Sequence, residues 1–287
     1  MPANMQQLII QSSALGSLPA VVVRISEAID DPKSTAMSIG RVINEDPALT
    51  ARLLKVVNSP FYGFRAKVDT VYRAIALIGH SELRNLVLGT SAIKVFGNVS
   101  SDLINIATFW RRSLYTGVLA RVIASYRRQK EIERYFIGGL LTDIGSLLLY
   151  TQEPKLASEC MEVMSESSLS LVEVEKDIYG FTHAELGGAL LEKWSLPPML
   201  CNVVAHHLEP DGADDAYKDD VLTVHVAHEL MLLLDVAGDS ERELLEVVDI
   251  VPHDLWESIG LELDILPSLL ERASQQFEGI RQALLSD

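Results

Sequence analysis

Asp143 lies in the middle of an otherwise apolar stretch, residues 138–147, which reads GGLLTDIGSL. Burying a carboxylate is costly unless a cation, a set of hydrogen-bond donors or a metal ion compensates its charge. Five of the seven histidines lie between residues 183 and 228: His183, His206, His207, His225 and His228. Imidazole nitrogens and a carboxylate oxygen are together suitable ligands for a divalent transition metal. These residue types predict a metal site centred on Asp143, or the remains of one.

The elements that must position these residues are helices. Apolar residues recur at helical spacing along nearly the whole chain, and no segment has a convincing strand pattern. The pattern predicts helices over residues 20–28, 48–58, 71–78, 82–96, 103–126, 136–150, 170–179, 183–194, 199–208, 221–236 and 265–285, with a further helix that begins at Pro154. We therefore expect an all-α protein with two helical lobes, residues 1–100 and 101–287, which meet near residues 99–102.

The composition excludes several classes of protein. The chain has 287 residues, is 48% hydrophobic and carries a formal net charge of -16, so it can bury a core but lacks the basic balance of a nucleic-acid-binding protein. Residues 1–17 lack the basic start of a signal peptide, and no apolar stretch approaches the ~18 residues of a membrane span. We therefore expect no membrane insertion. Cys160 and Cys201 lack the spacing of a zinc knuckle, so we expect them to be reduced, buried thiols of a cytoplasmic protein.

Residues 139–146 resemble the central motif of the HD superfamily of metal-dependent phosphohydrolases, Gly-Leu-Leu-His-Asp-Ile-Gly-Lys. Asp143 matches the motif aspartate. Thr142 stands where the family has its metal-binding histidine, and Ser146 stands where it has lysine. A threonine hydroxyl cannot replace imidazole as a transition-metal ligand.

Further motifs narrow the resemblance. Residues 58–63 (NSPFYG), 74–79 (AIALIG), 109–113 (FWRRS), 183–187 (HAELG) and 194–197 (WSLP) occur in an order and spacing similar to the HDOD family, the HD-related output domains of bacterial signalling proteins. This resemblance implies that the second lobe is an HD-like helical bundle.

The resemblance also implies positions for the site residues. Arg112 stands where catalytic HD proteins supply a first histidine ligand, so we expect its guanidinium to pair with Asp143 in a vestigial site of Arg112, Thr142, Asp143 and Ser146. Related cyclic-dinucleotide phosphodiesterases have histidine ligands that match His183, His206 and His207, and a late acidic ligand that aligns near His228. The candidate metal ligands are accordingly Asp143, His183, His206, His207 and His228.

The histidines also have interpretations that involve no metal. His206 and His207 are adjacent and would diverge by roughly 100° on a helix, which makes joint ligation difficult. His225 and His228 share one helical face, a spacing that suits two ligands or two core histidines equally.

We expect a catalytically inactive bacterial signalling module that acts through a signalling-protein partner or a small ligand and has no resident cofactor. The alternative is a divergent phosphohydrolase of nucleotides or cyclic dinucleotides that holds Fe, Mn, Ni or Zn. A nucleotide or cyclic-dinucleotide receptor without turnover lies between the two. The chain is not expected to bind nucleic acid.

Overall fold

The computed structural model describes residues 4–11, 20–97, 103–235 and 250–285. Within these ranges every regular element is helical and no strand is present, so the expected all-α class is confirmed. No helix in this part of the chain is long and apolar enough to cross a membrane.

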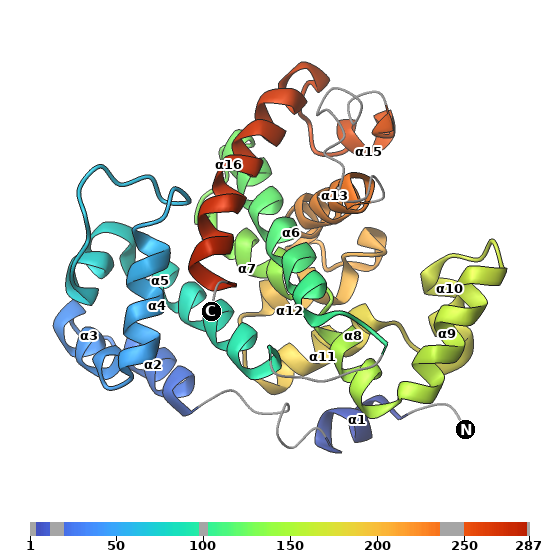
Figure 1. The fold of residues 1–287 in the computed structure, drawn as a ribbon, viewed down its shortest axis with the longest axis horizontal. Coiled ribbons are helices and arrows are strands. Elements are labelled where there is room, and N and C mark those ends of the chain that lie inside the picture. Colours follow the sequence, from blue (N-terminus) through green and yellow to red (C-terminus); the bar gives the residue numbers. More distant parts are fainter. Residues whose placement is uncertain (1–3, 12–19, 98–102, 236–249, 286–287) are drawn as a thin grey trace.

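The helices are numbered in chain order as in Figure 1. They are α1 (Met5–Gln11), α2 (Ala20–Asp30), α3 (Ala36–Asn44), α4 (Pro47–Val57), α5 (Val71–Phe96), α6 (Ile106–Tyr126), α7 (Glu133–Leu141), α8 (Ile144–Gln152), α9 (Pro154–Glu166), α10 (Leu171–Tyr179), α11 (His183–Lys193), α12 (Pro198–His206), α13 (Lys218–Asp235), α15 (His253–Glu257) and α16 (Leu266–Leu284), with short 3-10 turns η1 (Pro210–Gly212) and η2 (Leu263–Ile265).

The helix starts follow the capping signals in the sequence. The carboxylate of Asp46 accepts hydrogen bonds from the backbone amides of Ala48 and Leu49, with Pro47 in the first helical position. Thr182 caps α11 in a reciprocal capping box, and Ser170 does the same for α10. These caps matter for function because α10 and α11 carry two of the site residues described below.

At two places the division into helices differs from the expectation. The helices expected over 71–78 and 82–96 are joined in α5 and separated only by a kink at Gly79, whose φ of 85° favours glycine. The helix expected over 136–150 is broken instead. It ends at Leu141 as α7 and resumes at Ile144 as α8, so Asp143 lies at a junction rather than inside a helix.

Figure 1 shows α2 to α5 grouped at one side of the molecule, with α6 running through the centre. Helix α6 packs against α7, α13 and α16, while α8 and α12 pack against α11. The α1 helix packs on α8 and α11, where Lys193 Nζ donates a hydrogen bond to the Ile9 carbonyl at 2.7 Å. The division at 1–100 and 101–287 stays a prediction, because residues 99–102 fall outside the described ranges.

The buried guanidinium of Arg121 connects α6 with three other segments. Arg121 on α6 contacts Glu133 on α7 at 3.0 Å, and the two side chains are 8% and 10% exposed. The same guanidinium donates to Gln276 on α16 and lies 4.1 Å from the centre of the Phe61 ring. Phe61 belongs to the turn at residues 58–63, which Asn58 holds through hydrogen bonds with Leu54 and Val68. Four separate segments thus converge on one cation.

Replacing Arg121 with alanine should lower the free energy of unfolding by about 3–5 kcal/mol, because Glu133 would be left buried and unpaired. Arg24, whose pair with Glu45 is about half exposed, is the matched control. Arg24→Ala should cost less than about 1 kcal/mol. Urea unfolding followed by circular dichroism measures both, and equal losses in the two variants would contradict the structural role of Arg121.

Candidate metal centre

The site begins with the turn between α7 and α8. Asp143 has φ -92° and ψ 12°, outside the regular helical region, and its carbonyl accepts from Ser146 N at 3.0 Å. Breaking the helix here lets the carboxylate reach outward from the junction of two buried apolar helices. This local geometry explains how an aspartate fits into such an apolar stretch.

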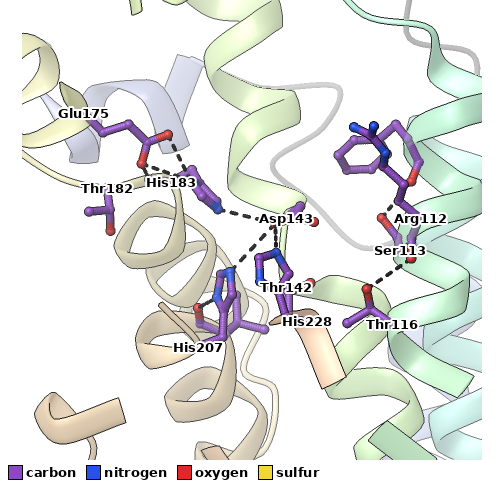
Figure 2. Close-up of polar contacts among 12 residues, drawn as sticks. Arg112, Ser113, Thr116, Thr142, Asp143, Glu175, Thr182, His183, His207 and His228 are labelled. Carbon is purple, nitrogen blue, oxygen red and sulfur yellow. Dashed lines mark hydrogen bonds and ion pairs between the residues drawn. The ribbon is translucent and has the colours of Figure 1, made fainter. Parts of the chain in front are cut away.

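Three imidazoles from three other segments surround this carboxylate (Figure 2). The Nε2 atoms of His183, His228 and His207 lie 3.3, 3.6 and 3.7 Å from Oδ1 of Asp143. His183 is the first residue of α11, His207 follows the last residue of α12, and His228 lies within α13. All three side chains are at least 93% buried.

Close packing of α8 on α11 brings His183 to the turn. A Cβ on Gly145 would lie 2.0 Å from the His183 carbonyl oxygen and 2.8 Å from the Gly187 amide nitrogen. Only glycine permits this approach. Gly145 is therefore a positioning residue of the site.

The far nitrogen of two of the three imidazoles is within hydrogen-bond distance of an acceptor. His183 Nδ1 lies 2.9 Å from both carboxylate oxygens of Glu175, and the Val204 carbonyl is 2.9 Å from His207 Nδ1. His228 Nδ1 is 3.7 Å from Glu229 Oε1, which is too long for a direct hydrogen bond. Such outer acceptors orient metal-binding histidines and fix the tautomer that directs Nε2 inward.

The charges are strongly coupled. Burial opposes ionisation of Asp143, yet the contacts with His183, His207 and His228 hold its pKa well below the usual range. Burial likewise disfavours imidazolium, but Glu175 and Asp143 raise the pKa of His183 to about 10. Burial dominates at His207 and lowers its pKa to about 4. The carboxylates Asp143, Glu175 and Glu229 therefore make this a centre that attracts positive charge.

The donor atoms fit a single metal ion. The Nε2 atoms of His183 and His207 are buried and make no hydrogen bond of acceptable geometry within the described chain. Two ligand atoms each about 2.1 Å from one ion at a tetrahedral angle lie roughly 3.4 Å apart, which is the spacing between Asp143 Oδ1 and the imidazole nitrogens. The candidate ligand atoms of Asp143, His183 and His207 all lie within 4.8 Å of one another. The set suits a borderline transition metal.

A cavity of about 590 Å³ opens in front of this centre. Asp143, His183 and His228 form part of its wall, together with Arg112 and Ser146 and with apolar residues of α6, α10 and α13. A ligand in the cavity could therefore reach the centre.

The structure divides the expected site residues. Asp143, His183, His207 and His228 come together, whereas His206 is half-buried against η1, where a Cβ on Gly212 would lie 3.0 Å from its Nδ1. The adjacent side chains of His206 and His207 therefore point to different places, His206 to η1 and His207 to Asp143.

The expected ion pair between Arg112 and Asp143 is not formed. The groups against Asp143 Oδ1 are the three imidazoles, and in Figure 2 no dashed line joins Asp143 to Arg112. Imidazoles from helices that are distant in sequence compensate the carboxylate, so no guanidinium is required. Arg112 lines the cavity instead, and the buried Thr142 hydroxyl donates to the Gly139 carbonyl.

Sequence reasoning missed Glu175 and Glu229. Glu175 is 4% exposed, although it lies on an amphipathic helix between Leu171 and Ile178 at helical spacing. The position of this glutamate within the apolar face of the helix is the sequence feature that could have indicated its burial. Glu229 follows His228 directly, a position without a comparable signal.

Fold and site define an all-helical protein with a buried three-histidine, one-aspartate centre. The sequence profile of the HDOD domain matches residues 15–210, more than half of the chain. This protein belongs to the HDOD family.

Solved structures share the fold. The chain is similar to a protein described as "Putative phosphohydrolase" from Shewanella amazonensis (22% identity, 99% of this chain and 98% of that chain covered, TM-score 0.78). It is also similar to an HDOD domain protein of unknown function from Geobacter sulfurreducens (20% identity, 98% and 97% covered, TM-score 0.79). An uncharacterized protein of Treponema pallidum is 27% identical over 219 residues, and the match spans 76% of this chain and 42% of that protein.

Replacing Gly145 with alanine should lower the free energy of unfolding by about 1–3 kcal/mol, because the added methyl group overpacks the α8–α11 contact. Gly40 is the matched control, since a Cβ there meets nothing nearer than 3.8 Å. Gly40→Ala should leave stability unchanged or raise it by up to about 1 kcal/mol. Thermal unfolding measures both, and a neutral Gly145→Ala would show that α8 and α11 need not pack this closely.

Proposed function

We propose that this protein is an HDOD regulatory module that holds one divalent transition-metal ion on Asp143, His183, His207 and His228. The observation that carries the proposal is that three imidazole nitrogens lie 3.3–3.7 Å from Asp143 Oδ1 in a centre with three carboxylates, and that Nε2 of His183 and of His207 is buried without a hydrogen-bond partner among the described residues. This proposal changes our sequence-based expectation of no resident cofactor. The ligand chemistry is compatible with Fe, Mn, Ni or Zn.

We favour a regulatory role over turnover because the residues near Asp143 lack ligands for a second metal ion. A two-metal phosphohydrolase needs ligands for a second ion about 3.5–4 Å from the first. At the two positions that would supply histidines, this chain has Thr142, whose hydroxyl is bonded to a backbone carbonyl, and the cationic Arg112. The residues around Asp143 thus provide one ion site.

The cavity next to the metal centre is where a signalling ligand would bind. Bound metal would supply a Lewis acid at the wall of the cavity. Arg112 adds positive charge at the wall, and Ser146 adds a hydroxyl. We propose that a small anionic ligand, such as a nucleotide or cyclic dinucleotide, binds here and that a signalling protein reads the resulting state.

A single-metal phosphohydrolase is the second candidate, because the centre opens to a cavity large enough for a substrate. In that case Asp143 and the histidines would orient the ion, and Arg112 would hold the phosphoryl group. The two functions are separated by turnover and not by metal content.

Protein purified without a histidine tag should contain about one Fe, Mn, Ni or Zn ion per chain, as measured by inductively coupled plasma mass spectrometry. His207→Ala should reduce the content to near zero, because it removes a buried ligand. His206→Ala, the adjacent histidine against η1, is the control and should retain the ion. Loss of metal in both variants, or in neither, would contradict the assignment of His207.

The replacement Thr142→His should not create phosphodiesterase activity, because the position of Arg112 still lacks an imidazole for a second ion. Hydrolysis of bis(p-nitrophenyl) phosphate with added Mn²⁺ measures this, with the wild-type protein as the reference. Turnover by the variant alone would show that one histidine suffices to rebuild the site. Turnover by the wild-type protein, lost in His207→Ala, would favour the second candidate function.

A further inference from the structure

A second cavity, of about 340 Å³, lies behind the metal centre between α8, α9 and α10. Figure 1 shows α9 and α10 side by side at the edge of the molecule. The volume is at the lower end of the range of about 300–1,000 Å³ that is typical of small-molecule sites.

The walls of this cavity are apolar and polarizable. Cys160, Met161 and Met164 of α9 line it, together with the aliphatic residues Leu149 and Ala157. Methionine side chains adapt to irregular apolar ligands and make favourable contacts with aromatic rings. Burial raises the pKa of the Cys160 thiol to about 11, so this thiol is neutral.

The wall also has polar residues, among them Tyr179, Ser165 and Glu175. Tyr179 is 2% exposed, but its hydroxyl is not among the fully buried oxygens and makes no hydrogen bond to the described residues, so it can donate to a molecule in the cavity. Burial raises the pKa of this phenol, which leaves it a neutral donor. The nearby carboxylate of Glu175 disfavours an anion in the same space. The wall therefore suits an uncharged molecule that carries one hydrogen-bond acceptor.

The cavity is connected to the metal centre by shared side chains. Glu175 lines it and also holds His183 Nδ1 through both carboxylate oxygens at 2.9 Å. Tyr150 and Leu171 line this cavity on one side and the 590 Å³ cavity on the other. A molecule that moves Glu175 would therefore change the orientation of a metal ligand.

We infer that the α8–α9–α10 cavity binds a small, neutral, largely apolar molecule with a hydrogen-bond acceptor, such as an aromatic ketone, and that Glu175 transmits its presence to His183. The inference that a molecule binds in the cavity does not depend on the proposed function. The inference that binding affects His183 rests on the proposed function, because it requires metal at the centre.

The probes are 1-indanone and indane, which share one shape and differ in a single carbonyl oxygen. Full-length protein labelled with ¹³C at the methionine methyl groups reports the location, because the chain has only seven methionines. 1-Indanone should shift the methyl signals of Met161 and Met164 and leave that of Met231, in the cavity that faces the metal centre, unchanged. A shift of Met231 alone, or no shift at millimolar probe, would overturn the inference.

Two variants test the chemistry of the site. Tyr179→Phe should weaken 1-indanone binding roughly three- to tenfold, as expected for one hydrogen bond, and leave indane binding unchanged. Ala157→Leu fills the cavity and should remove the shifts with both probes. Equal affinities of Tyr179→Phe and wild type for 1-indanone would refute the assigned role of the hydroxyl.

Transmission is tested by metal titration of the full chain with and without saturating 1-indanone. The metal dissociation constant should change about fivefold or more, within the range of ordinary coupling between sites. An unchanged constant, with the methyl shifts present, would refute transmission through Glu175. If no metal binds at all, the proposed function and the transmission fail together, while the methyl shifts still decide whether the cavity is a binding site.

Discussion

The structure depends on how one buried carboxylate is compensated. Asp143 lies at the junction of two apolar helices, where an uncompensated charge would cost several kcal/mol. The compensation comes from His183, His207 and His228, which belong to three segments that follow it in the chain. The packing of α8, α11, α12 and α13 therefore has to satisfy the electrostatics of Asp143 as well as bury apolar surface.

The same constraint explains the supporting residues. Glycine at position 145 lets α11 approach α8, and Glu175 turns the His183 ring so that its Nε2 faces Asp143. His183 and His207 are anchored at Nδ1 and direct Nε2 inward, an orientation that suits metal ligands. It also leaves one face of the centre open to a cavity. Site geometry and access thus arise from the same helix contacts.

Much of this fold could be predicted from sequence because its determinants are local. The cap at Asp46 and the capping boxes at Ser170 and Thr182 follow from neighbouring residues. The site was only partly predictable. Resemblance to HD proteins pointed to Asp143 and to all three histidines that surround it, but it also included His206, whose separation from His207 depends on where α12 ends. The partner of Asp143 depends on the packing of distant helices, which is why Arg112 was assigned to it incorrectly.

The most direct test is anomalous X-ray diffraction from crystals of the metal-loaded protein, recorded on both sides of the absorption edge of the bound element. A single anomalous peak should lie within bonding distance, about 2.0–2.2 Å, of Asp143 Oδ1 and of the Nε2 atoms of His183, His207 and His228. A peak elsewhere, or two peaks flanking Asp143, would contradict a one-ion regulatory centre.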